Sequence, residues 1–386
     1  MKKNVLIINQ SAELYGADKA LLELLQNYPE DYNPIVVLHE EGPLKKILEE
    51  LGIQVIKSSV IKVKRGVLNP SFFIALPFDI IRSILHIKKE LKGQKVAFVH
   101  SNAISVFIGA FYSFFLRKKH LWHVHEIIVH PEKLAKWYPK IVSFFSDKIV
   151  FNSKATAEQF KKNCTNIEKK SVIVYNGQNR NQSFSTYEET EQIRLNEFKL
   201  RNNSIVAIGL VGRISRLKGQ QVLLKSFKKL CSKYPNIHLV YIGSTPPGQD
   251  YYLDKLKAKI EEYGLFEYTT ILDFKQNIWP YYDALDIVVV PSTEPESFGL
   301  VATESMLSKR PVVASKLGGL QEIILHGETG YLFESGNSAD LCDQLEKLIE
   351  NPSLCKTLGE KGQERVKICF STKNYVGGIK SVYDSM

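Results

Sequence analysis

The segment from Glu296 to Glu304 carries two carboxylates and a glycine, Gly299, in a spacing that could bind a ligand. It follows the apolar run 286–292, so a strand is predicted to end and a helix to begin here. In open α/β sheets, small molecules bind at strand ends, and the N-terminus of the following helix offers N–H groups to an anion or a polar ring. Two carboxylates could then hold two parts of one polyhydroxylated ligand. The alternative is a helix with two solvated glutamates.

Two basic residues, Arg213 and Lys218, follow another predicted strand and the glycine Gly212. From this position a planar guanidinium and a mobile ammonium group could both reach a diphosphate. Arg216 lies between them and could take either role. The alternative is a solvated basic pair at a helix start, but the helix dipole disfavours cations there, which favours an anionic ligand.

Two further candidate sites lie in the first half of the chain. Gly16, in the loop 11–18, either lets the backbone approach a ligand closely or is an ordinary turn glycine. His123 and His125 end a predicted strand, where residues two apart face the same side. No third ligand stands near them, so a zinc site is not expected. No Asp-x-Asp pair follows a strand, so no other metal site is expected either.

The elements that position these residues alternate between short β-branched runs and longer helical patterns in both halves of the chain. Near-continuous apolar runs of this kind are typical of buried parallel strands joined by crossover helices. The predicted strands are 5–8, 35–38, 96–99, 121–125, 148–151 and 172–174, followed by 205–211, 238–242, 270–272, 287–290 and 312–314. The polar segment 178–203 is predicted to connect two domains, and a last helix is predicted over 372–383.

Composition limits the class of protein. The chain has 386 residues, 44% of them hydrophobic, which is enough for two cores because a single core stops growing near ~250–300 residues. The net charge of +10 indicates an anionic partner, but no nucleic-acid-binding signature is present. Five scattered cysteines suit a reducing cytoplasm. The first apolar run is too short for a signal peptide, and the longest, 104–116, is too short to cross a bilayer.

Five motifs, in order along the chain, resemble those of the retaining glycosyltransferases of GT-B type, family 4 (group 1), typified by sucrose and glycogen synthases. They are the glycine loop 11–18, the Asn-Gly at 176–177, the phosphate segment 211–219, the Glu-x-Phe-Gly…Glu signature at 296–304, and the late glycine elements at 317–322 and 330–333. The resemblance implies an α/β fold with two Rossmann-like doubly wound domains facing each other across a cleft. It assigns 1–185, joined by a terminal helix at 371–386, to the acceptor side, and 200–370 to the nucleotide sugar.

The resemblance also implies roles for the candidate residues. Glu304 would bind the ribose hydroxyls and Glu296 the transferred sugar; Glu294 is a rival, but only Glu296 has the right spacing to Phe298 and Glu304. The peptide N–H groups of Phe298, Gly299 and Leu300 would donate to the sugar, and Arg213 and Lys218 would bind the diphosphate. In the first half of the chain, His125 would contact the donor sugar and Gly16 a phosphate or sugar. The backbone near Phe274 would contact the nucleobase.

The chain departs from the family pattern at three places. Lys309 stands where a glycine usually follows the helix, and Asp273 replaces a glycine near the nucleobase, which leaves the choice of base open. Tyr15 and Gly16 replace two successive glycines in the first loop, which bears on the acceptor.

The predicted function is transfer of a hexose from a UDP- or GDP-linked sugar to a hydroxyl of a glycan or lipid-linked glycan in cell-surface polysaccharide synthesis. No cofactor, metal ion or nucleic-acid partner is expected, and the predicted location is the cytoplasm. The basic aromatic segments 80–92 and 104–120 could lie on the anionic inner face of the membrane, or be buried helices with basic ends. The alternatives are a nucleotide-sugar-binding subunit without transfer activity and a UDP-sugar epimerase on the same fold, a family that lacks the Glu-x-Phe-Gly…Glu arrangement.

Overall fold

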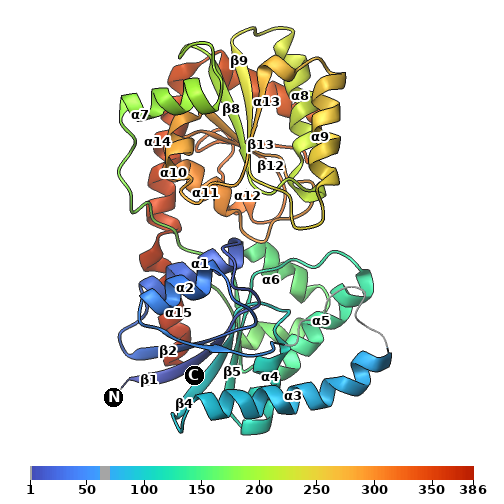
Figure 1. Ribbon diagram of the computed structural model, residues 1–386, viewed down its shortest axis with the longest axis vertical. Helices are drawn as coiled ribbons and strands as arrows, with labels where there is room; N and C mark the ends of the chain where they lie inside the picture. Colours follow the sequence, from blue (N-terminus) through green and yellow to red (C-terminus); the bar gives the residue numbers. More distant parts are fainter. Residues whose placement is uncertain (1, 61–69) are drawn as a thin grey trace. The chain divides into compact units, whose positions relative to one another are not determined.

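The computed structural model describes residues 2–60 and 70–386. The chain forms two compact units, one made of residues up to Gly177 together with Ser371–Met386, the other of Gln178–Phe370. Figure 1 labels the helices and strands of each unit. Each unit is built on its own parallel sheet with helices on both faces, so the expectation of two doubly wound α/β domains is confirmed.

The first unit contains a seven-stranded sheet in the order β3-β2-β1-β4-β5-β6-β7. Its strands are β1 (Lys3–Ile8), β2 (Tyr32–Leu38), β3 (Gln54–Lys57), β4 (Val96–Ser101), β5 (Lys119–Val124), β6 (Lys148–Phe151) and β7 (Ser171–Ile173). Its α-helices are α1 (Gly16–Gln26), α2 (Pro43–Glu50), α3 (Pro70–Glu90), α4 (Phe107–Leu116), α5 (Glu132–Phe145), α6 (Lys154–Lys161) and α15 (Thr372–Asp384).

Alternate residues of the first strand pack against different helices. Val5 and Ile7 face the cluster that contains side chains of α1, α2 and α15, whereas Leu6 and Ile8 face the cluster of α3 and α4. The C-terminal helix α15 belongs to this core, because the ring of Tyr383 lies 5.0 Å from that of Phe98, between ring centroids. The last helix of the chain therefore stabilises the first sheet.

The second unit contains a six-stranded sheet in the order β10-β9-β8-β11-β12-β13. Its strands are β8 (Val206–Val211), β9 (Ile237–Ile242), β10 (Thr269–Leu272), β11 (Ile287–Val290), β12 (Val312–Ser315) and β13 (Tyr331–Phe333). Its α-helices are α7 (Tyr187–Gln192), α8 (Gln220–Cys231), α9 (Tyr251–Glu262), α10 (Trp279–Ala284), α11 (Leu300–Leu307), α12 (Leu320–Ile323), α13 (Ser338–Ile349) and α14 (Pro352–Cys369).

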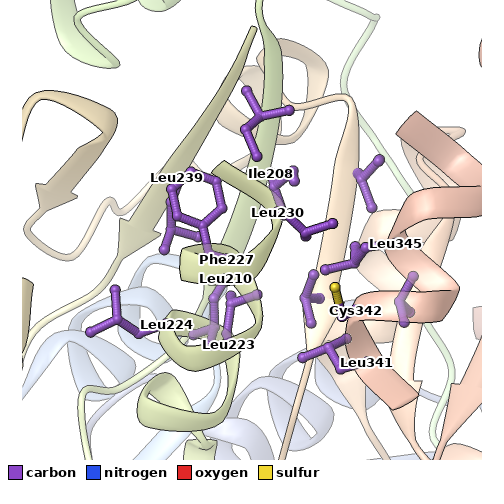
Figure 2. Close-up of a cluster of buried hydrophobic side chains, with 14 of the residues drawn as sticks. Ile208, Leu210, Leu223, Leu224, Phe227, Leu230, Leu239, Leu341, Cys342 and Leu345 are labelled. Atoms are coloured by element: carbon purple, nitrogen blue, oxygen red, sulfur yellow. The ribbon is translucent and has the colours of Figure 1, made fainter. Parts of the chain in front are cut away.

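The main core of the second unit lies on the sheet face covered by α8, α9 and α13. Figure 2 shows Leu210 of β8 and Leu239 of β9 near Phe227 of α8, with Leu341 and Leu345 of α13 in the same cluster. Each of these side chains is at most 2% exposed. The opposite face is covered by α10 and by the segment before β8.

Four sequence-based expectations about the elements were wrong. Residues 178–203 are not a connection, because α7 forms there and Phe198 and Leu200 are buried in the core of the second unit. The first unit accordingly ends at Gly177 rather than at residue 185. Strands β3 and β13 were not predicted as strands, since both are short runs at sheet edges, and β5 ends at Val124, one residue before His125.

The strand order of each sheet reverses between two neighbouring strands whose crossover helices leave in opposite directions. In the first unit these strands are β1 and β4, and in the second they are β8 and β11. Open α/β sheets bind ligands beyond the carboxyl ends of such strands. The segments after β8 and β11 contain Arg213 and Glu296, so both candidates lie at the switch point of the second sheet.

Candidate functional site

The Glu296 carboxylate is held from two sides in the loop between β11 and α11. Lys218 Nζ lies 2.6 Å from Glu296 Oε1, and the Ser292 hydroxyl donates to the same oxygen. The Glu296 side chain is only 15% exposed. Burial acts to raise the pKa of Glu296, but Lys218, Ser292 and Arg213 outweigh burial and lower it. Glu296 is therefore a half-buried, ionised group next to a cation.

The Gly-Gly pair after β12 supports the backbone of Glu296. Gly319 N–H donates to the Glu296 carbonyl at 2.8 Å. Gly318 has φ +58°, and a Cβ at that position would lie 2.3 Å from the same carbonyl oxygen. Only glycine combines the left-handed backbone with such a close approach, so this motif serves to place Glu296.

The basic residues after β8 take different partners. Lys218 pairs with Glu296, whereas Arg216 pairs with Glu294 at the surface. The Arg213 side chain is exposed, and its charge contributes to lowering the pKa of Glu296. The structure thus brings together Arg213, Lys218 and Glu296 and separates them from the rival pair.

Glu304 is a second carboxylate, buried in the middle of α11 and 4% exposed. Tyr282 Oη donates to Glu304 Oε2 at 2.8 Å, and Gln178 Nε2 donates to Glu304 Oε1 at 3.1 Å. Thr303 Oγ1 donates in turn to Gln178 Oε1 at 2.7 Å. Each carboxylate oxygen therefore has a fixed direction before any ligand arrives.

The start and end of α11 explain two sequence features. Gly299 precedes the helix with φ +125°, Phe298 is buried against the ring of Phe370, and Leu300 is the first helical residue, where N–H groups have no helical partner. After the helix, Lys309 has φ +56°, which costs a non-glycine residue roughly 1–3 kcal/mol. A glycine is the less strained residue at this position, and the chain has a lysine there instead.

The backbone near Phe274 is the part expected at the nucleobase, and the Phe274 side chain is 60% exposed just after β10. Its backbone N–H donates to Ser244 Oγ at 3.0 Å. Ser244 follows β9, so these neighbouring strand ends are tied together. The structure places Phe274 at the same carboxyl edge of the sheet as Arg213 and Glu296.

In the first unit, a chain of hydrogen bonds joins His125 to a buried carboxylate. His125 Nε2 bonds Asn102 Oδ1 at 3.0 Å, Asn102 Nδ2 donates to Asn9 Oδ1 at 2.9 Å, and Asn9 Nδ2 donates to Asp18 Oδ1 at 2.8 Å. Because an amide oxygen only accepts, Nε2 carries the His125 proton. His125 Nδ1 is then a buried acceptor, and the residues that the structure describes offer it no hydrogen-bond donor. Gly16 is exposed at the start of α1, two residues before Asp18.

Three histidine rings form a buried row: His100 lies on β4, His123 lies on β5, and His125 directly follows β5. The His123 ring centroid lies 3.9 Å from that of His125 and 5.5 Å from that of His100. Burial lowers the pKa of His100 and of His125 to about 3, so both are neutral near pH 7. In the part of the chain that the structure describes, no group of three or more His, Cys, Asp or Glu side chains is arranged to hold a metal ion.

Next to these histidines, burial raises the pKa of the Glu126 carboxyl to about 7. The N–H groups of Ile104 and His125 donate to this carboxyl and act to lower its pKa, but burial has the larger effect. Glu126 thus titrates in the physiological range, next to His125.

Several residues of these sites were missed by sequence reasoning. Ser292 orients Glu296, and Tyr282 and Gln178 orient Glu304. Asn9 and Asn102 orient His125. Most of their partners are far away along the chain, up to 126 positions for Gln178, so no short spacing pattern identifies them. Ser292, Asn9 and Asn102 follow strands closely, which could have suggested them, whereas no local signal points to Gln178.

Comparisons with known proteins give consistent matches across the chain. The family model described as Glycosyltransferase Family 4 matches residues 15–182, and the one described as Glycosyl transferases group 1 matches residues 193–365. An uncharacterised glycosyltransferase of Methanocaldococcus jannaschii is 28% identical over 310 residues, which cover 78% of each chain.

The capsular polysaccharide biosynthesis glycosyltransferase CapM of Staphylococcus aureus is 27% identical over 64% of this chain and 63% of its own length, somewhat less than two thirds. Among solved structures, HepE of Anabaena superposes with a TM-score of 0.84 at 24% identity and covers 99% of both chains. This similarity shows that both chains have the same GT-B fold.

Proposed function

Because the chain belongs to the glycosyltransferases of group 1 and family 4, with the GT-B fold, we propose that it transfers a hexose from a nucleoside diphosphate sugar to a hydroxyl acceptor. The observation that carries this proposal is the half-buried Lys218–Glu296 pair beside Arg213 at the switch point of the second sheet. Such a cluster offers cations to a diphosphate and a carboxylate to a sugar. The Anabaena fold neighbour was solved in complex with UDP and glucose, which supports UDP as the donor nucleotide.

In the proposed reaction, the protein positions the donor and acceptor and stabilises the charge on the leaving group. The bond between the sugar C1 and the phosphate oxygen breaks while the acceptor oxygen bonds C1 on the same face, which retains the configuration. The departing phosphate oxygen takes the acceptor proton. Arg213 and Lys218 stabilise the negative charge that grows on the diphosphate, and this contribution is larger in the transition state than in the bound substrate.

The remaining candidates complete the proposed donor site. Glu304, fixed by Tyr282 and Gln178, accepts from the two ribose hydroxyls. The peptide N–H groups of Phe298, Gly299 and Leu300 contact the sugar beside Glu296. In the first unit, His125 is the proposed contact to the donor sugar, and Gly16 is the proposed contact to a phosphate or sugar. Phe274 marks the backbone beside the nucleobase.

The acceptor is proposed to be a glycan or lipid-linked glycan of a cell-surface polysaccharide. A relative from Staphylococcus aureus is named for capsular polysaccharide biosynthesis, and a shorter match is named a lipopolysaccharide core mannosyltransferase. These names describe the two relatives, and they support the same class of acceptor for this chain.

Transfer should require no divalent metal, since Arg213 and Lys218 supply the positive charge that a metal would otherwise provide. Donor hydrolysis measured over a panel of UDP- and GDP-sugars should show turnover of at least one, and EDTA should change that rate by less than about twofold. Loss of turnover in EDTA with rescue by Mn²⁺ would contradict the cationic clamp. Nucleotide-sugar binding without any turnover would favour the non-catalytic alternative.

We also propose that the first unit contacts an anionic membrane through the outer face of α5. Five exposed residues recur at helical spacing on this face: Lys133, Lys136, Trp137, Lys140 and Phe144. The Phe144 side chain is 75% exposed. Lys140 Nζ lies 5.1 Å from the Trp137 ring centroid, so cationic and aromatic groups alternate on one face. Exposed aromatic rings and lysines suit a bilayer interface with acidic lipids.

The same surface continues onto α4, one of the two segments singled out in the sequence. Phe144 packs edge-on against Phe145, and Phe145 against Phe114, which is 59% exposed. The buried residues of α4 lie in its first part, from Phe107 to Ser113. The basic end of the segment 104–120 therefore follows a largely apolar helix. On α3, Phe78, Ile81 and Leu85 are exposed as well. Among the described residues, no helix has the length and apolarity needed to span a bilayer.

Co-sedimentation with vesicles tests the membrane surface. The protein should bind vesicles of phosphatidylcholine with phosphatidylglycerol and not vesicles of phosphatidylcholine alone. Lys133→Gln with Lys136→Gln should weaken binding by about tenfold or more, since each lysine contributes roughly 1 kcal/mol near an anionic surface. Phe144→Ser should weaken binding too, whereas Phe266→Ser, at a residue of the second unit that is 77% exposed, should not. Equal effects of the two Phe variants, or self-association through this face, would contradict a membrane contact.

A further inference from the structure

A separate cavity lies in the second unit at the amino ends of its strands, at the sheet edge opposite to Glu296. Its volume is about 310 Å³, which is within the lower range of small-molecule sites, roughly 300–1,000 Å³. Its walls come from the segment 184–187, from α7 and from residues that precede β8, β11 and β12. Figure 1 shows α7 and α10, which contribute to these walls, on one flank of the sheet.

The two aspartates that line this cavity already have partners. Arg180 forms two hydrogen bonds of 2.6 Å to Asp283, which also accepts from the Ser185 N–H at 2.8 Å. Arg194 bonds Asp286 at 3.0 Å. The negative charge of both carboxylates is therefore largely balanced by two guanidinium groups that lie beside them.

A third guanidinium, that of Arg310, has no such partner. Arg310 lines the cavity just before β12, and its Nε is buried without a hydrogen-bond acceptor in the structure. Burial lowers the pKa of Arg310, while Asp286 and Asp283 act in the opposite direction. A guanidinium stays protonated in proteins, so the Nε–H of Arg310 is a charged donor for which the described residues provide no acceptor.

The neighbouring residue adds a cation at the rim of the cavity. Lys309 Nζ lies 5.6 Å from the ring centroid of Phe184, which lines the cavity, and Arg180 lies 4.2 Å from the same ring. The departure from glycine at position 309, in a left-handed backbone conformation, thus places positive charge beside Arg310. The cavity is also lined by Glu191, whose carboxylate accepts a hydrogen bond from Asn203. Four cations, those of Arg180, Arg194, Lys309 and Arg310, therefore stand against three carboxylates, so the net charge of the surroundings favours an anion.

We propose that this cavity binds the phosphate group of a small molecule, with the planar fork of Arg310 as the main contact. A phosphate offers several oxygens to the Arg310 guanidinium, including its unsatisfied Nε–H, and a guanidinium binds phosphate with two parallel hydrogen bonds. The cavity is larger than the contact with one guanidinium requires, so it can also accommodate the group that carries the phosphate. The site is independent of the proposed donor site, which lies at the other edge of the same sheet.

Calorimetry on the full chain with inorganic phosphate and with glucose 1-phosphate tests the proposal. Arg310→Gln should weaken binding by about tenfold or more, as expected for loss of charged hydrogen bonds. Thr190→Glu, which adds a carboxylate to the wall and keeps Arg310, should have a similar effect. Gln192→Glu makes a comparable charge change on an exposed position of the same helix that does not line the cavity, and should change affinity by less than about twofold.

Phosphate can also bind the donor site, so Lys218→Gln distinguishes the two. The proposed site is supported if phosphate binding persists in Lys218→Gln and falls by about tenfold or more when Arg310→Gln or Thr190→Glu is added to that variant. It is overturned if neither probe binds, if Lys218→Gln abolishes all binding, or if the Arg310 and Thr190 variants bind like the wild type. Tighter binding of glucose 1-phosphate identifies a phosphate ester as the ligand and equal affinity identifies free phosphate, and either result supports the site.

Discussion

Replacing Glu296 with glutamine should lower kcat by about 10²–10³-fold and leave the affinity for free UDP or GDP within about twofold. In the proposed mechanism Glu296 faces the sugar as positive charge develops there, so its contribution is larger in the transition state than in the ground state. Glutamine has nearly the same shape and removes the charge. Nucleotide affinity should not fall, because the change also releases Lys218 from its 2.6 Å ion pair and leaves that ammonium available to phosphate.

Initial-rate kinetics beside calorimetry with free nucleotide give the two readouts. The matched control is Glu294→Gln, since Glu294 lies two residues away and pairs with Arg216 rather than Lys218. That control should retain kcat within about threefold, because a surface ion pair contributes little. An equal loss of kcat in the two variants would contradict the proposed contact between Glu296 and the transferred sugar.

Replacing Glu304 with glutamine should weaken free nucleotide and intact donor alike, by on the order of 1–3 kcal/mol, or about 10–100-fold in Kd. The physical reason is that a buried carboxylate would accept from both ribose hydroxyls, and the ribose is present in substrate and product. The kcat at saturating donor should change little, since this interaction is the same in ground and transition states.

A companion variant tests the hydrogen bond that orients the Glu304 carboxylate. Tyr282→Phe removes the 2.8 Å hydrogen bond to Glu304 and keeps both the charge and the buried ring. Its effect on nucleotide affinity should have the same direction as that of Glu304→Gln and be smaller. If Glu296→Gln loses as much nucleotide affinity as Glu304→Gln, the roles assigned to the two glutamates are wrong.

Much of the architecture could be predicted from local sequence, because buried parallel strands have a distinctive apolar signature. Runs such as 5–8 and 287–290 lie within or coincide with β1 and β11, and the ordered motifs correctly identified the family and the two-domain fold. The errors have a common cause. Strands β3 and β13 are short edge strands, and 178–203 is polar because most of its side chains are exposed, although Phe198 and Leu200 are in the core.

The sequence by itself determined which groups are available for chemistry, since residue type and short spacing place Glu296 and Glu304 on one loop and helix, and Arg213 and Lys218 on another segment. The tertiary structure decided how they are paired. The parallel sheet brings β8 beside β11, so that Lys218 meets Glu296 across 78 positions of the chain and Arg216 meets Glu294 instead. Hydrogen bonds to Glu304 from Tyr282 and Gln178, and the unsatisfied guanidinium of Arg310, likewise depend on which strands and helices become neighbours, which no local pattern encodes.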